Sequence, residues 1–547
     1  MNEELDLEEL APWLVLAIVL VGGGLRILLL RTKGLWLDET FSIWMAKQSV
    51  AEIVQWTIKI DQHPPLYYLL LHFWIGRFGD TPYYVRLLSA LIGAGTIPVI
   101  YLIGKRLSSP LVGLAAAVFL AFSPYHIYFA QETRMYTLLT FNAAVAIYAL
   151  VRLLTNPNTS QPIGHQLREY WQARRTPDPV EPATFSYTPQ TRRRWPPIEN
   201  MATDLTWLVF ILFSAATMLT HNTAVLFPLA TNIFVLGLIL RQKFNKSGSQ
   251  LTLQVPSVAN WVKAQIGIFL LWSPWLVPFI KQARTVSERF WIPEPTADAV
   301  LQVLRTFLNA SAPLPASEAR IIWSLYVLAL CLGLVYYRKK ISQLLLLVTL
   351  FAIPFVAELL VSLHRPIFYD RTLIWTTIPL FLFLAAGIAQ LRYRFLILAG
   401  VGILGAINFF SVSDYFRFFQ KEDWNTPAGY VANYAEEGDL VLFNSNFVEI
   451  AFNYYFEPYE DFYGIEVEKQ GVPLDLIKDG VLEPEMTESD MPALISMIDG
   501  RDRVWLVYSH ESYTDPTGLV PLTLTSRMEL IRQRDFYGGQ VRLYTAP

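Results

Sequence analysis

The chain has 547 residues, of which 53% are hydrophobic and 16% are charged, and its formal net charge is -3. Soluble domains carry about 25% charged residues, so this composition indicates a protein that crosses a membrane many times, and the small negative charge provides no basic surface for nucleic acid. The single cysteine, Cys331, lies in an apolar segment, which excludes an internal disulfide framework and a thiolate metal site.

Eleven apolar segments are long enough to cross a bilayer, which takes about 20 mainly apolar residues. They are centred near residues 21, 94, 120, 145, 212, 232, 271, 330, 352, 381 and 403. The first segment lacks a basic leader and a small-residue cleavage site before Trp36, so we expect it to stay as an anchor. The sequence therefore predicts a polytopic α-helical membrane protein with about 11 transmembrane helices.

Lysine and arginine residues at the ends of these segments indicate the orientation, because short cytoplasmic loops are enriched in both. If the segments alternate in direction, five basic clusters fall on one side, one of them within a long loop over residues 152–204. These clusters are Lys105/Arg106, Arg192-Arg193-Arg194, Arg241/Lys243/Lys246, Arg338-Lys339-Lys340 and Arg392/Arg394. Arg31 and Lys33 on the other side argue against this orientation, but the later clusters outweigh them.

We therefore expect an integral protein of the plasma (inner) membrane with a cytoplasmic N-terminus. The loops 32–82 and 281–320, the short turn around Glu132 and the segment 364–371 then face the outside. The same alternation places the charged residues of these four segments at one face of the membrane.

The C-terminal part of the chain has a different composition. Residues 440–443, 503–508 and 540–544 read as strands, and residues 448–455 and 528–533 read as helices. We expect a transmembrane domain over residues 1–411, followed by an extracytoplasmic soluble α/β domain over residues 412–547.

Asp38 and Glu39 follow the first apolar segment and are candidates for a chemical role. Adjacent side chains on a helix point about 100° apart, so one acid can face a cavity while the other caps or pairs. A single catalytic acid is therefore expected. The alternative is an ordinary loop acid beside interfacial aromatic residues such as Trp36 and Trp44.

Three more residues of the outer loops are candidates for a site. His63 precedes a stiff Pro-Pro step that holds it at a fixed point, where it either binds an anionic ligand or forms a turn hydrogen bond. Glu132 and Arg134 lie in a very short turn between two apolar segments, where the alternative to a site is a mutual ion pair.

Glu358 is the one acid well inside an apolar segment, where an ionised carboxylate costs roughly 2.5 to 3.5 kcal/mol. It should therefore have a partner, and Arg365 or His364 near the outer end of the segment is the natural candidate. A direct role in ligand binding is the alternative. With Arg371, these two basic residues form a cluster suited to a phosphate, because a guanidinium matches phosphate oxygens in pairs; snorkelling at the membrane edge is the other interpretation.

Five motifs, in order between residue 11 and about residue 411, resemble the bacterial branch of the GT-C glycosyltransferases. The group they resemble most contains the protein O-mannosyltransferases and the aminoarabinose transferases of glycosyltransferase family 39 and their bacterial relatives. The motifs are Leu35-Trp36-Leu37-Asp38-Glu39, His63-Pro64-Pro65-Leu66-Tyr67-Tyr68, Arg86-Leu87, Gln131-Glu132-Thr133-Arg134-Met135-Tyr136 and Tyr369-Asp370-Arg371. Each motif alone is weak, but five of them on one membrane face are specific.

The resemblance implies an inverting glycosyltransferase that moves a sugar from a polyprenyl-phosphate donor to an acceptor hydroxyl at the outer face. The acid after the first span is the family's catalytic carboxylate, and this sequence matches it with Asp38, with Glu39 as its neighbour. Basic residues of the first and last outer loops hold the donor phosphate in the family. The corresponding residues here are Arg371, His63, Arg365 and His364. His63 stands where the aminoarabinose transferases have lysine, so a weaker or pH-dependent contact is expected there.

The residues that we expect to bind the acceptor or to provide a second acid are Glu132, Arg134 and Tyr136. Glu132 would orient the acceptor or serve as a metal ligand in members that bind a metal, so no metal site is predicted and a divalent metal stays open as a cofactor. The implied partners are the lipid-linked donor, a glycan, lipid or protein acceptor and membrane lipids, with no nucleic acid. Sugar, acceptor and prenyl length are not encoded in any motif.

A flippase or transporter for lipid-linked sugars is the alternative function, since it also needs a membrane cavity with charged groups. The sequence shows neither an inverted repeat nor paired broken helices, and its acids gather at one face instead of the midplane. A receptor whose helices serve only as an anchor is a third interpretation, and eleven spans exceed what an anchor needs.

Overall fold

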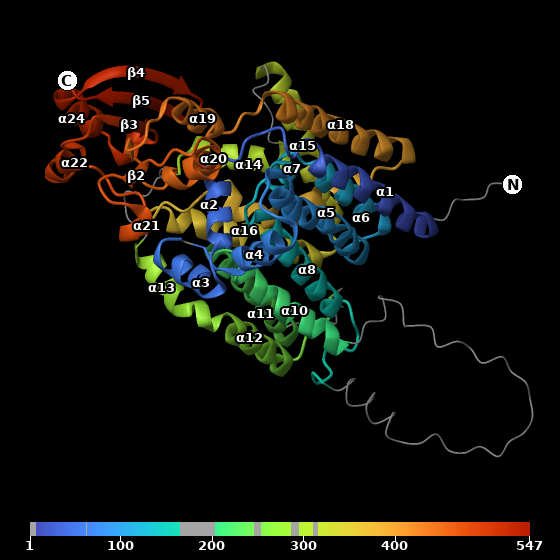
Figure 1. The fold of residues 1–547 in the computed structure, drawn as a ribbon. Helices are drawn as coiled ribbons and strands as arrows, with labels where there is room; N and C mark the ends of the chain where they lie inside the picture. Colours follow the sequence, from blue (N-terminus) through green and yellow to red (C-terminus); the bar gives the residue numbers. More distant parts are fainter. Residues whose placement is uncertain (1–6, 62, 165–202, 245–252, 286–294, 310–315) are drawn as a thin grey trace, which may run out of the picture.

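The computed structural model describes residues 7–61, 63–164, 203–244, 253–285, 295–309 and 316–547. Most of the long loop with the Arg192-Arg193-Arg194 run therefore lies outside the described residues, as do parts of the loop 281–320. The described chain is a bundle of long helices with an α/β domain at one end (Figure 1).

Nine of the described helices are long and apolar enough to cross a membrane. They are α1 (Leu7–Ile27), α5 (Pro82–Leu107), α8 (Tyr136–Leu154), η2 with α11 (Asn222–Val225 and Leu226–Phe244), α12 to α13 (Val258–Trp272 and Leu276–Thr285, joined by η3, Ser273–Trp275), α15 (Ala316–Tyr337), α16 (Ile341–Val361), η4 with α17 (Asp370–Thr376 and Thr377–Ala389) and α18 (Arg394–Phe418). The chain is therefore an integral, multi-pass membrane protein.

The two other predicted spans are also apolar helices, with different lengths. α6 (Pro110–Phe122) and α7 (Pro124–Ala130) form a tenth span if the pair, which bends by 58°, is counted as one. α10 (Thr203–Met218) has 16 residues and is shorter than a usual span. All eleven predicted segments thus coincide with described apolar helices.

The bend between α6 and α7 places a short turn at the end of the bundle that bears the α/β domain. Pro124 lacks the N–H that would continue α6, and Ser123 caps α7 by accepting a hydrogen bond from the N–H of His126. Because α7 ends at Ala130 and α8 begins at Tyr136, the turn between them cannot leave the bundle end. Elsewhere the helices pack closely: α15 and α17 cross at Gly333 and Gly387, where any side chain would collide with the partner's backbone.

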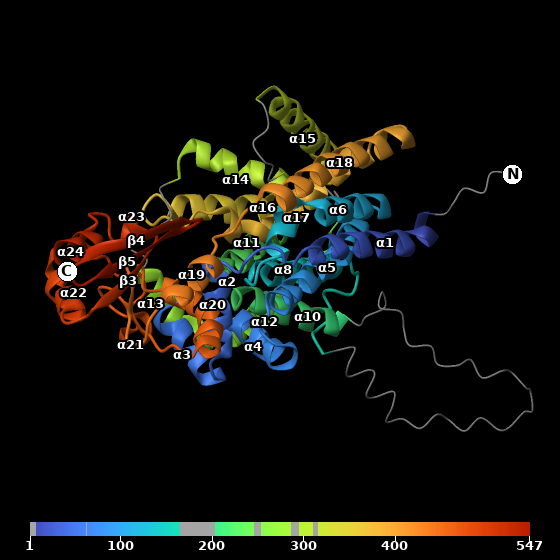
Figure 2. The ribbon, with the colours of Figure 1, turned by 45° about the horizontal axis from the view of Figure 1, so that its top comes forward.

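Three shorter helices connect α1 to α5 at the end of the bundle that bears the α/β domain. They are α2 (Leu37–Lys47), α3 (Val50–Lys59) and α4 (Leu66–Phe78), and a further helix, α14 (Ala297–Asn309), precedes α15. Ser49 begins α3 with a capping box to Glu52, and the Pro64-Pro65 step precedes α4. In Figures 1 and 2, α2 lies next to α20 of the α/β domain.

The α/β domain contains one five-stranded sheet with the order β2-β1-β3-β5-β4. The strands are β1 (Leu440–Phe443), β2 (Glu468–Gly471), β3 (Arg503–Tyr508), β4 (Glu529–Phe536) and β5 (Gly539–Thr545). β1 pairs in parallel with β2 and β3, whereas β5 is antiparallel to β3 and β4. The predicted strands at 440–443, 503–508 and 540–544 and the predicted helix at 448–455 are confirmed.

Helices cover both faces of this sheet. α19 (Asn425–Tyr434) and α20 (Val448–Tyr463) pack on one face, and α22 (Met491–Ile498) and α24 (Leu519–Arg527) on the other. The remaining helices are short: α21 (Leu476–Asp479), η5 (Glu488–Asp490) and α23 (Glu511–Thr514). Side chains of successive strand residues point to opposite faces, so the sheet has a hydrophobic core on each side.

The helix expected over 528–533 is wrong, because this segment belongs to the edge strand β4. Almost all of β4 is exposed, so it lacks the alternation of apolar and polar residues that signals a strand. Its pairing is fixed by the tight turn in which Phe536 faces Gly539. The charged side chains on this edge protect it from pairing with another chain.

The α/β domain is docked by α20 on the helices that connect α1 to α5. The core between α19, α20 and the sheet includes Ile60, and Phe41 and Trp56 pack against it from α2 and α3. The hydroxyl of Tyr455 accepts a hydrogen bond from the N–H of Leu35 at 2.6 Å. Apolar burial and a polar contact thus hold the domain over the end of the bundle.

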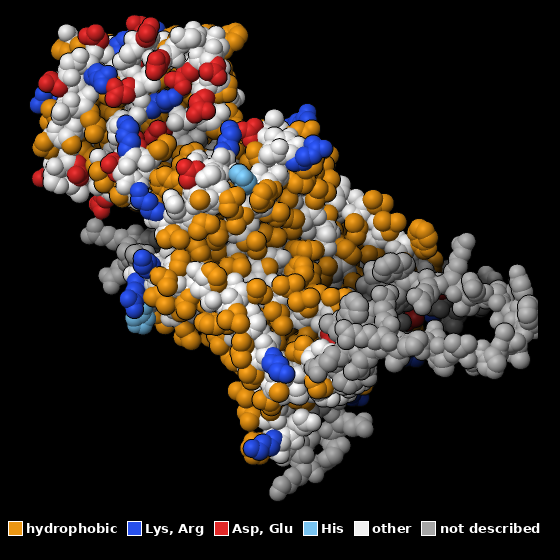
Figure 3. All heavy atoms as spheres, turned by 60° about the horizontal axis from the view of Figure 1, so that its bottom comes forward, with side chains coloured by type: hydrophobic (Ala, Val, Ile, Leu, Met, Phe, Trp, Pro, Cys, Tyr) orange, Lys and Arg blue, Asp and Glu red, His pale blue; other side chains and the backbone are white. Residues whose placement is uncertain are grey.

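The composition of the surface differs between the helical bundle and the α/β domain. Figure 3 shows hydrophobic side chains over the helical body and charged side chains over the α/β domain. Large apolar residues such as Leu398 and Phe244 are 73% exposed on the helices. A soluble surface rarely carries apolar patches of this extent, whereas a lipid bilayer covers them.

Candidate active site

A cavity of about 420 Å³ lies where the ends of the helices meet the α/β domain. Its charged and histidine lining residues come from six separate segments of the chain. They are Asp38, Asp61, His63, Arg134, His221, Glu358, Arg365, Arg371 and Glu483. Phe279, Leu226 and Val361 line it with apolar side chains. The cavity therefore joins an apolar wall to a cluster of charges.

Asp38 faces this cavity from the first turn of α2. Its Oδ2 lies 3.3 Å from Nη1 of Arg371 and 3.8 Å from Nε of Arg134, and its side chain is 27% exposed. Nη1 of Arg134 also donates to the hydroxyls of Ser42 (3.3 Å) and Tyr68 (3.4 Å). The structure thus brings Asp38 together with residues far apart in the sequence.

The charges around Asp38 keep it ionised. Burial by itself would raise its pKa, but the positive charges of Arg134 and Arg371 lower the pKa of Asp38 below its ordinary value, with a further contribution from His63. Asp38 is therefore a carboxylate at neutral pH. It can accept a proton or attract a positive centre.

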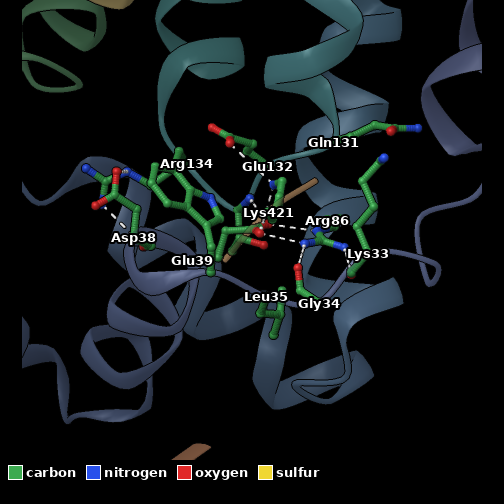
Figure 4. Close-up of polar contacts among 12 residues, drawn as sticks. Lys33, Gly34, Leu35, Asp38, Glu39, Arg86, Gln131, Glu132, Arg134 and Lys421 are labelled. Atoms are coloured by element: carbon green, nitrogen blue, oxygen red, sulfur yellow. Dashed lines mark hydrogen bonds and ion pairs between the residues drawn. The ribbon is translucent and has the colours of Figure 1, made fainter. Parts of the chain in front are cut away.

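Glu39 points away from the cavity into a buried ion cluster, as the helical spacing of the two acids predicts (Figure 4). Arg86 donates from Nε to Oε1 (2.7 Å) and from Nη2 to Oε2 (2.5 Å) of Glu39. Lys421, from the connection between α18 and α19, donates to Oε2 at 2.9 Å. The N–H of Thr133 donates to Oε1 at 3.0 Å.

Arg86 uses all five of its N–H donors in this cluster. Beside Glu39, it donates to the main-chain carbonyls of Leu30 (2.9 Å), Lys33 (2.7 Å) and Gly34 (2.8 Å). A buried guanidinium is tolerated only when its donors are paired. The cluster therefore fixes the connection between α1 and α2 to α5, and with it the position of Asp38.

The pKa of Glu39 reflects these partners. Burial would raise it, but Arg86 and Lys421 lower the pKa of Glu39 to about 2. Glu132 lies 3.3 Å from the same lysine through its Oε1. Burial raises the pKa of Glu132 above its ordinary value, although Lys421 opposes this. Glu132 lies outside the cavity lining, next to the cluster.

His63 and Tyr136 both line the cavity near Asp38. Nδ1 of His63 lies 2.8 Å from Oδ1 of Asp61, and the rings of His63 and His221 are 5.0 Å apart. Burial lowers the pKa of His221 well below its ordinary value, so this imidazole is neutral. The guanidinium of Arg371 lies 5.8 Å from the centre of the Tyr136 ring.

The other two predicted phosphate ligands differ in position. Arg365 lines the cavity, and its Nη1 donates to the main-chain carbonyl of Ala283. His364 is exposed and does not belong to the cavity lining. The structure therefore groups Arg371, His63 and Arg365 at one cavity and leaves His364 outside it.

The partner expected for Glu358 was Arg365 or His364, and the structure gives a different one. Oε2 of Glu358 hydrogen-bonds with the hydroxyl of Thr372 at 2.6 Å. Thr372 directly follows Arg371 in η4, which turns back over the end of α16. This turn brings the Thr372 hydroxyl to Glu358, whereas Arg365 donates to the main-chain carbonyl of Ala283.

Several lining residues were not found from the sequence. Phe447, Leu482 and Glu483 reach the cavity from the α/β domain, whose segments carry no recognisable motif. One sequence feature could have pointed to Lys421. It lies on the side that the sequence predicts to be extracytoplasmic, where lysine is less common than in cytoplasmic loops. Its burial in an ion cluster explains that exception.

The part of the chain that the structure describes contains no preformed metal site. No group of three or more His, Cys, Asp or Glu side chains there is arranged to hold a metal ion. Glu132, for which the sequence left the role of a metal ligand open, lies 3.3 Å from Nζ of Lys421.

The helical bundle, the helices that connect α1 to α5 and the α/β domain together have the fold of the GT-C glycosyltransferases, which confirms the resemblance seen in the sequence. A family model described as dolichyl-phosphate-mannose-protein mannosyltransferase matches residues 62–164. No curated protein sequence matches the chain.

Solved structures of two proteins share this fold. ArnT from Cupriavidus metallidurans in the apo state aligns with a TM-score of 0.58 and 11% identity over 97% of both chains. The same protein bound to undecaprenyl phosphate aligns with a TM-score of 0.55 and 10% identity, again over 97% of both chains. A second similar structure is the oligosaccharyltransferase AglB from Archaeoglobus fulgidus in complex with an inhibitory peptide and a dolichol-phosphate. It aligns with a TM-score of 0.53 and 8% identity over 98% of this chain and 74% of AglB. The family match and the fold support a glycosyltransferase of the GT-C type.

Proposed function

We propose that the chain is an inverting glycosyltransferase that transfers a sugar from a polyprenyl-phosphate donor to an acceptor hydroxyl at the outer face of the membrane. The observation that carries this proposal is the cavity in which the carboxylate of Asp38 lies 3.3 Å from Arg371 and 3.8 Å from Arg134. A base and two cations at a cavity with an apolar wall are the groups that such a transfer needs. The fold supports it, since ArnT and AglB were both solved with a polyprenyl phosphate.

In this proposal, Arg371 and Arg134 hold the donor phosphate, with His63 and Arg365 at the edge of the site. A guanidinium provides two parallel donors to phosphate oxygens, which lysine cannot. The apolar wall formed by Phe279, Leu226 and Val361 accommodates the start of the lipid tail. The phosphate then lies at the boundary between hydrocarbon and water.

Asp38 takes the proton from the acceptor hydroxyl as its oxygen attacks the anomeric carbon. The bond between that carbon and the phosphate oxygen breaks, and the electron pair leaves with the polyprenyl phosphate. One displacement inverts the anomeric centre and needs no second carboxylate as nucleophile. The anionic donor also competes with Asp38 for Arg371, which makes the carboxylate a stronger base when the donor is bound.

Glu39 acts as a positioning residue in this scheme, because its oxygens are occupied by Arg86, Lys421 and the Thr133 N–H. Tyr136, which follows the turn that carries Arg134, lines the same cavity and is the residue that we propose for the acceptor. Glu132 affects the acceptor only through this neighbouring turn. The catalytic role thus belongs to Asp38 alone.

We also propose the orientation and domain organisation that the sequence predicts: a cytoplasmic N-terminus, a transmembrane domain over residues 1–411 and an extracytoplasmic domain over residues 412–547. Lys33 supports this orientation, since it donates to main-chain carbonyls of Tyr415 and Phe419 and is therefore not a membrane anchor. The C-terminal domain closes the outer side of the cavity through Phe447, Leu482 and Glu483.

The direct test is an assay of the purified full-length protein with radiolabelled short-chain polyprenyl-phosphate sugars. Membranes of the source organism supply the acceptors. We expect label in the acceptor fraction with wild type and not with Asp38→Asn. Movement of the labelled lipid across a liposome membrane without any transfer would instead identify a flippase and overturn the proposal.

A further inference from the structure

A second carboxylate of the cavity, Glu358, has no part in the proposed transfer. It lies in the last turn of α16, is 1% exposed and lines the cavity. Its Oε1 has no hydrogen-bond partner among the residues that the structure describes. A buried polar oxygen without a partner costs about 1 to 3 kcal/mol, so such an atom at a cavity points to a ligand.

The neighbouring polar groups are engaged elsewhere. Arg365 donates from Nη1 to the main-chain carbonyl of Ala283. Thr223 is close enough to Glu358 to interact with it. However, the N–H of Thr223 donates to Nδ1 of His221 at 3.2 Å, so this nitrogen is an acceptor, and the Thr223 hydroxyl lies 3.0 Å from it. The Thr223 hydroxyl also donates to the main-chain carbonyl oxygen of Thr372 at 3.5 Å, and it forms no hydrogen bond with Oε1 of Glu358.

The contacts of Thr372 determine the protonation of Glu358. Its hydroxyl oxygen lies 2.6 Å from Oε2 of Glu358 and 2.7 Å from the main-chain carbonyl oxygen of Tyr369. A hydroxyl has one proton and cannot donate to two acceptors at such short distances. Both contacts are satisfied if Oε2 carries a proton and donates to Thr372, which in turn donates to Tyr369. Oε1 is then a carbonyl oxygen directed at the cavity.

We infer that Glu358 is a specificity-determining residue whose Oε1 accepts a hydrogen bond from a hydroxyl of the donor's sugar. The inference rests on the proposed function. A phosphodiester anion has only acceptor oxygens and the lipid tail has no polar hydrogen, so neither can satisfy Oε1. The sugar is attached to the phosphate that Arg371 holds, and Thr372, the partner of Glu358, is the next residue in η4.

The test measures the binding of a bare short-chain polyprenyl phosphate and of its mannosyl, glucosyl, galactosyl and glucosaminyl esters to the purified full-length protein in detergent. Glu358→Leu removes the acceptor oxygen. We expect about a tenfold loss of affinity for the ester that wild type binds best, which corresponds to about 1.4 kcal/mol. Affinity for the bare lipid phosphate should stay within twofold of wild type.

Glu358→Gln is the matched variant. Its amide nitrogen can donate to Thr372 and its amide oxygen faces the cavity, so it should bind the same ester nearly as well as wild type. Equal losses for bare lipid and ester in Glu358→Leu would overturn the inference. So would a loss in Glu358→Gln confined to the glucosaminyl ester, because an ionised carboxylate would then be binding an ammonium. Wild type that binds none of these lipids would overturn the proposed function itself.

Discussion

Oδ2 of Asp38 lies 3.3 Å from Nη1 of Arg371, although the two residues are 333 positions apart in the chain. Asp38 belongs to α2 after the first span, and Arg371 belongs to η4, which directly precedes α17. The proposed base and the proposed phosphate ligand therefore contact each other directly. A bound phosphate has to share Arg371 with Asp38, which couples donor binding to the basicity of the acid.

Asp38→Asn should abolish transfer while folding stays near wild type. The amide keeps the shape of the side chain but cannot take a proton, and removal of a general base typically costs about 10²- to 10⁴-fold in rate. The rate of sugar transfer by purified protein measures the effect. Activity within tenfold of wild type would remove Asp38 from the catalytic role, and a comparable loss in a folded Glu39→Gln variant would transfer that role to Glu39.

Arg371→Ala should weaken donor binding much more than acceptor binding, because hydrogen bonds to charged groups contribute roughly 1.5 to 3 kcal/mol each. Arg371→Lys should recover only part of the affinity, since lysine keeps the charge and loses the planar pair of donors. Titration with a short-chain polyprenyl phosphate should show that affinity decreases from wild type to Arg371→Lys and further to Arg371→Ala. Arg338→Ala, at the opposite end of the bundle, is the control, and equal affinity of wild type and Arg371→Ala would exclude Arg371 from the site.

The cluster around Glu39 shows which parts of the site the sequence could not provide. The helical spacing of the two adjacent acids predicts that one faces a cavity and the other pairs, and the motifs mark Asp38, Arg134 and Arg371 as members of one membrane face. No local pattern identifies Lys421 as the partner of Glu39, because the two are 382 positions apart and meet only through tertiary packing.

The same distinction applies to the fold. Long apolar segments predict the helices well, since hydrocarbon length and backbone hydrogen bonding restrict what can cross a bilayer. The sheet domain was read partly, because the buried strands β1 and β3 are strongly apolar, whereas the exposed edge strand β4 resembles a helix in composition. The cavity residues Leu482 and Glu483 follow from domain docking, which leaves no periodic signal.

Glu39→Gln should destabilise the protein by about 3 to 5 kcal/mol, because it leaves Arg86 and Lys421 buried without their counter-ion. Burial opposes ionisation, yet these cations lower the pKa of Glu39 from 4.5 to about 2. A carboxylate with a lowered pKa stabilises the fold above its unfolded pKa and loses this contribution as the pH falls. The difference in thermal unfolding midpoint between wild type and Glu39→Gln should therefore shrink between about pH 4.5 and pH 2.

The matched control for this prediction is Asp38→Asn, one position earlier in α2. Asp38 is 27% exposed, so its replacement should shift the unfolding midpoint much less than Glu39→Gln does. Equal midpoints for Glu39→Gln and wild type at neutral pH would contradict the structural role of the buried cluster.

The proposed orientation predicts different labelling of two positions in intact cells. A cysteine introduced into the domain 412–547 should react with a membrane-impermeant thiol reagent, and one introduced near Arg193 should react only after the cells are opened. Cys331 is exposed on the helices and should first be replaced. The opposite pattern would reverse the orientation and place the cavity on the cytoplasmic side.

Glu483 should make donor binding depend on pH near neutrality. Burial raises the pKa of Glu483 to about 7, with His510 opposing the shift and Asp38 adding to it. Below pH 7 the side chain is therefore neutral, and above it a negative charge is added to a cavity that has to hold an anionic phosphate. We expect the donor affinity of wild type to fall roughly two- to tenfold between pH 6 and pH 8, and to fall less in Glu483→Gln. A glycosylated polyprenyl phosphate is the ligand to use, because a phosphodiester does not titrate in this range. Parallel pH profiles for the two proteins would show that the charge of Glu483 does not reach the donor.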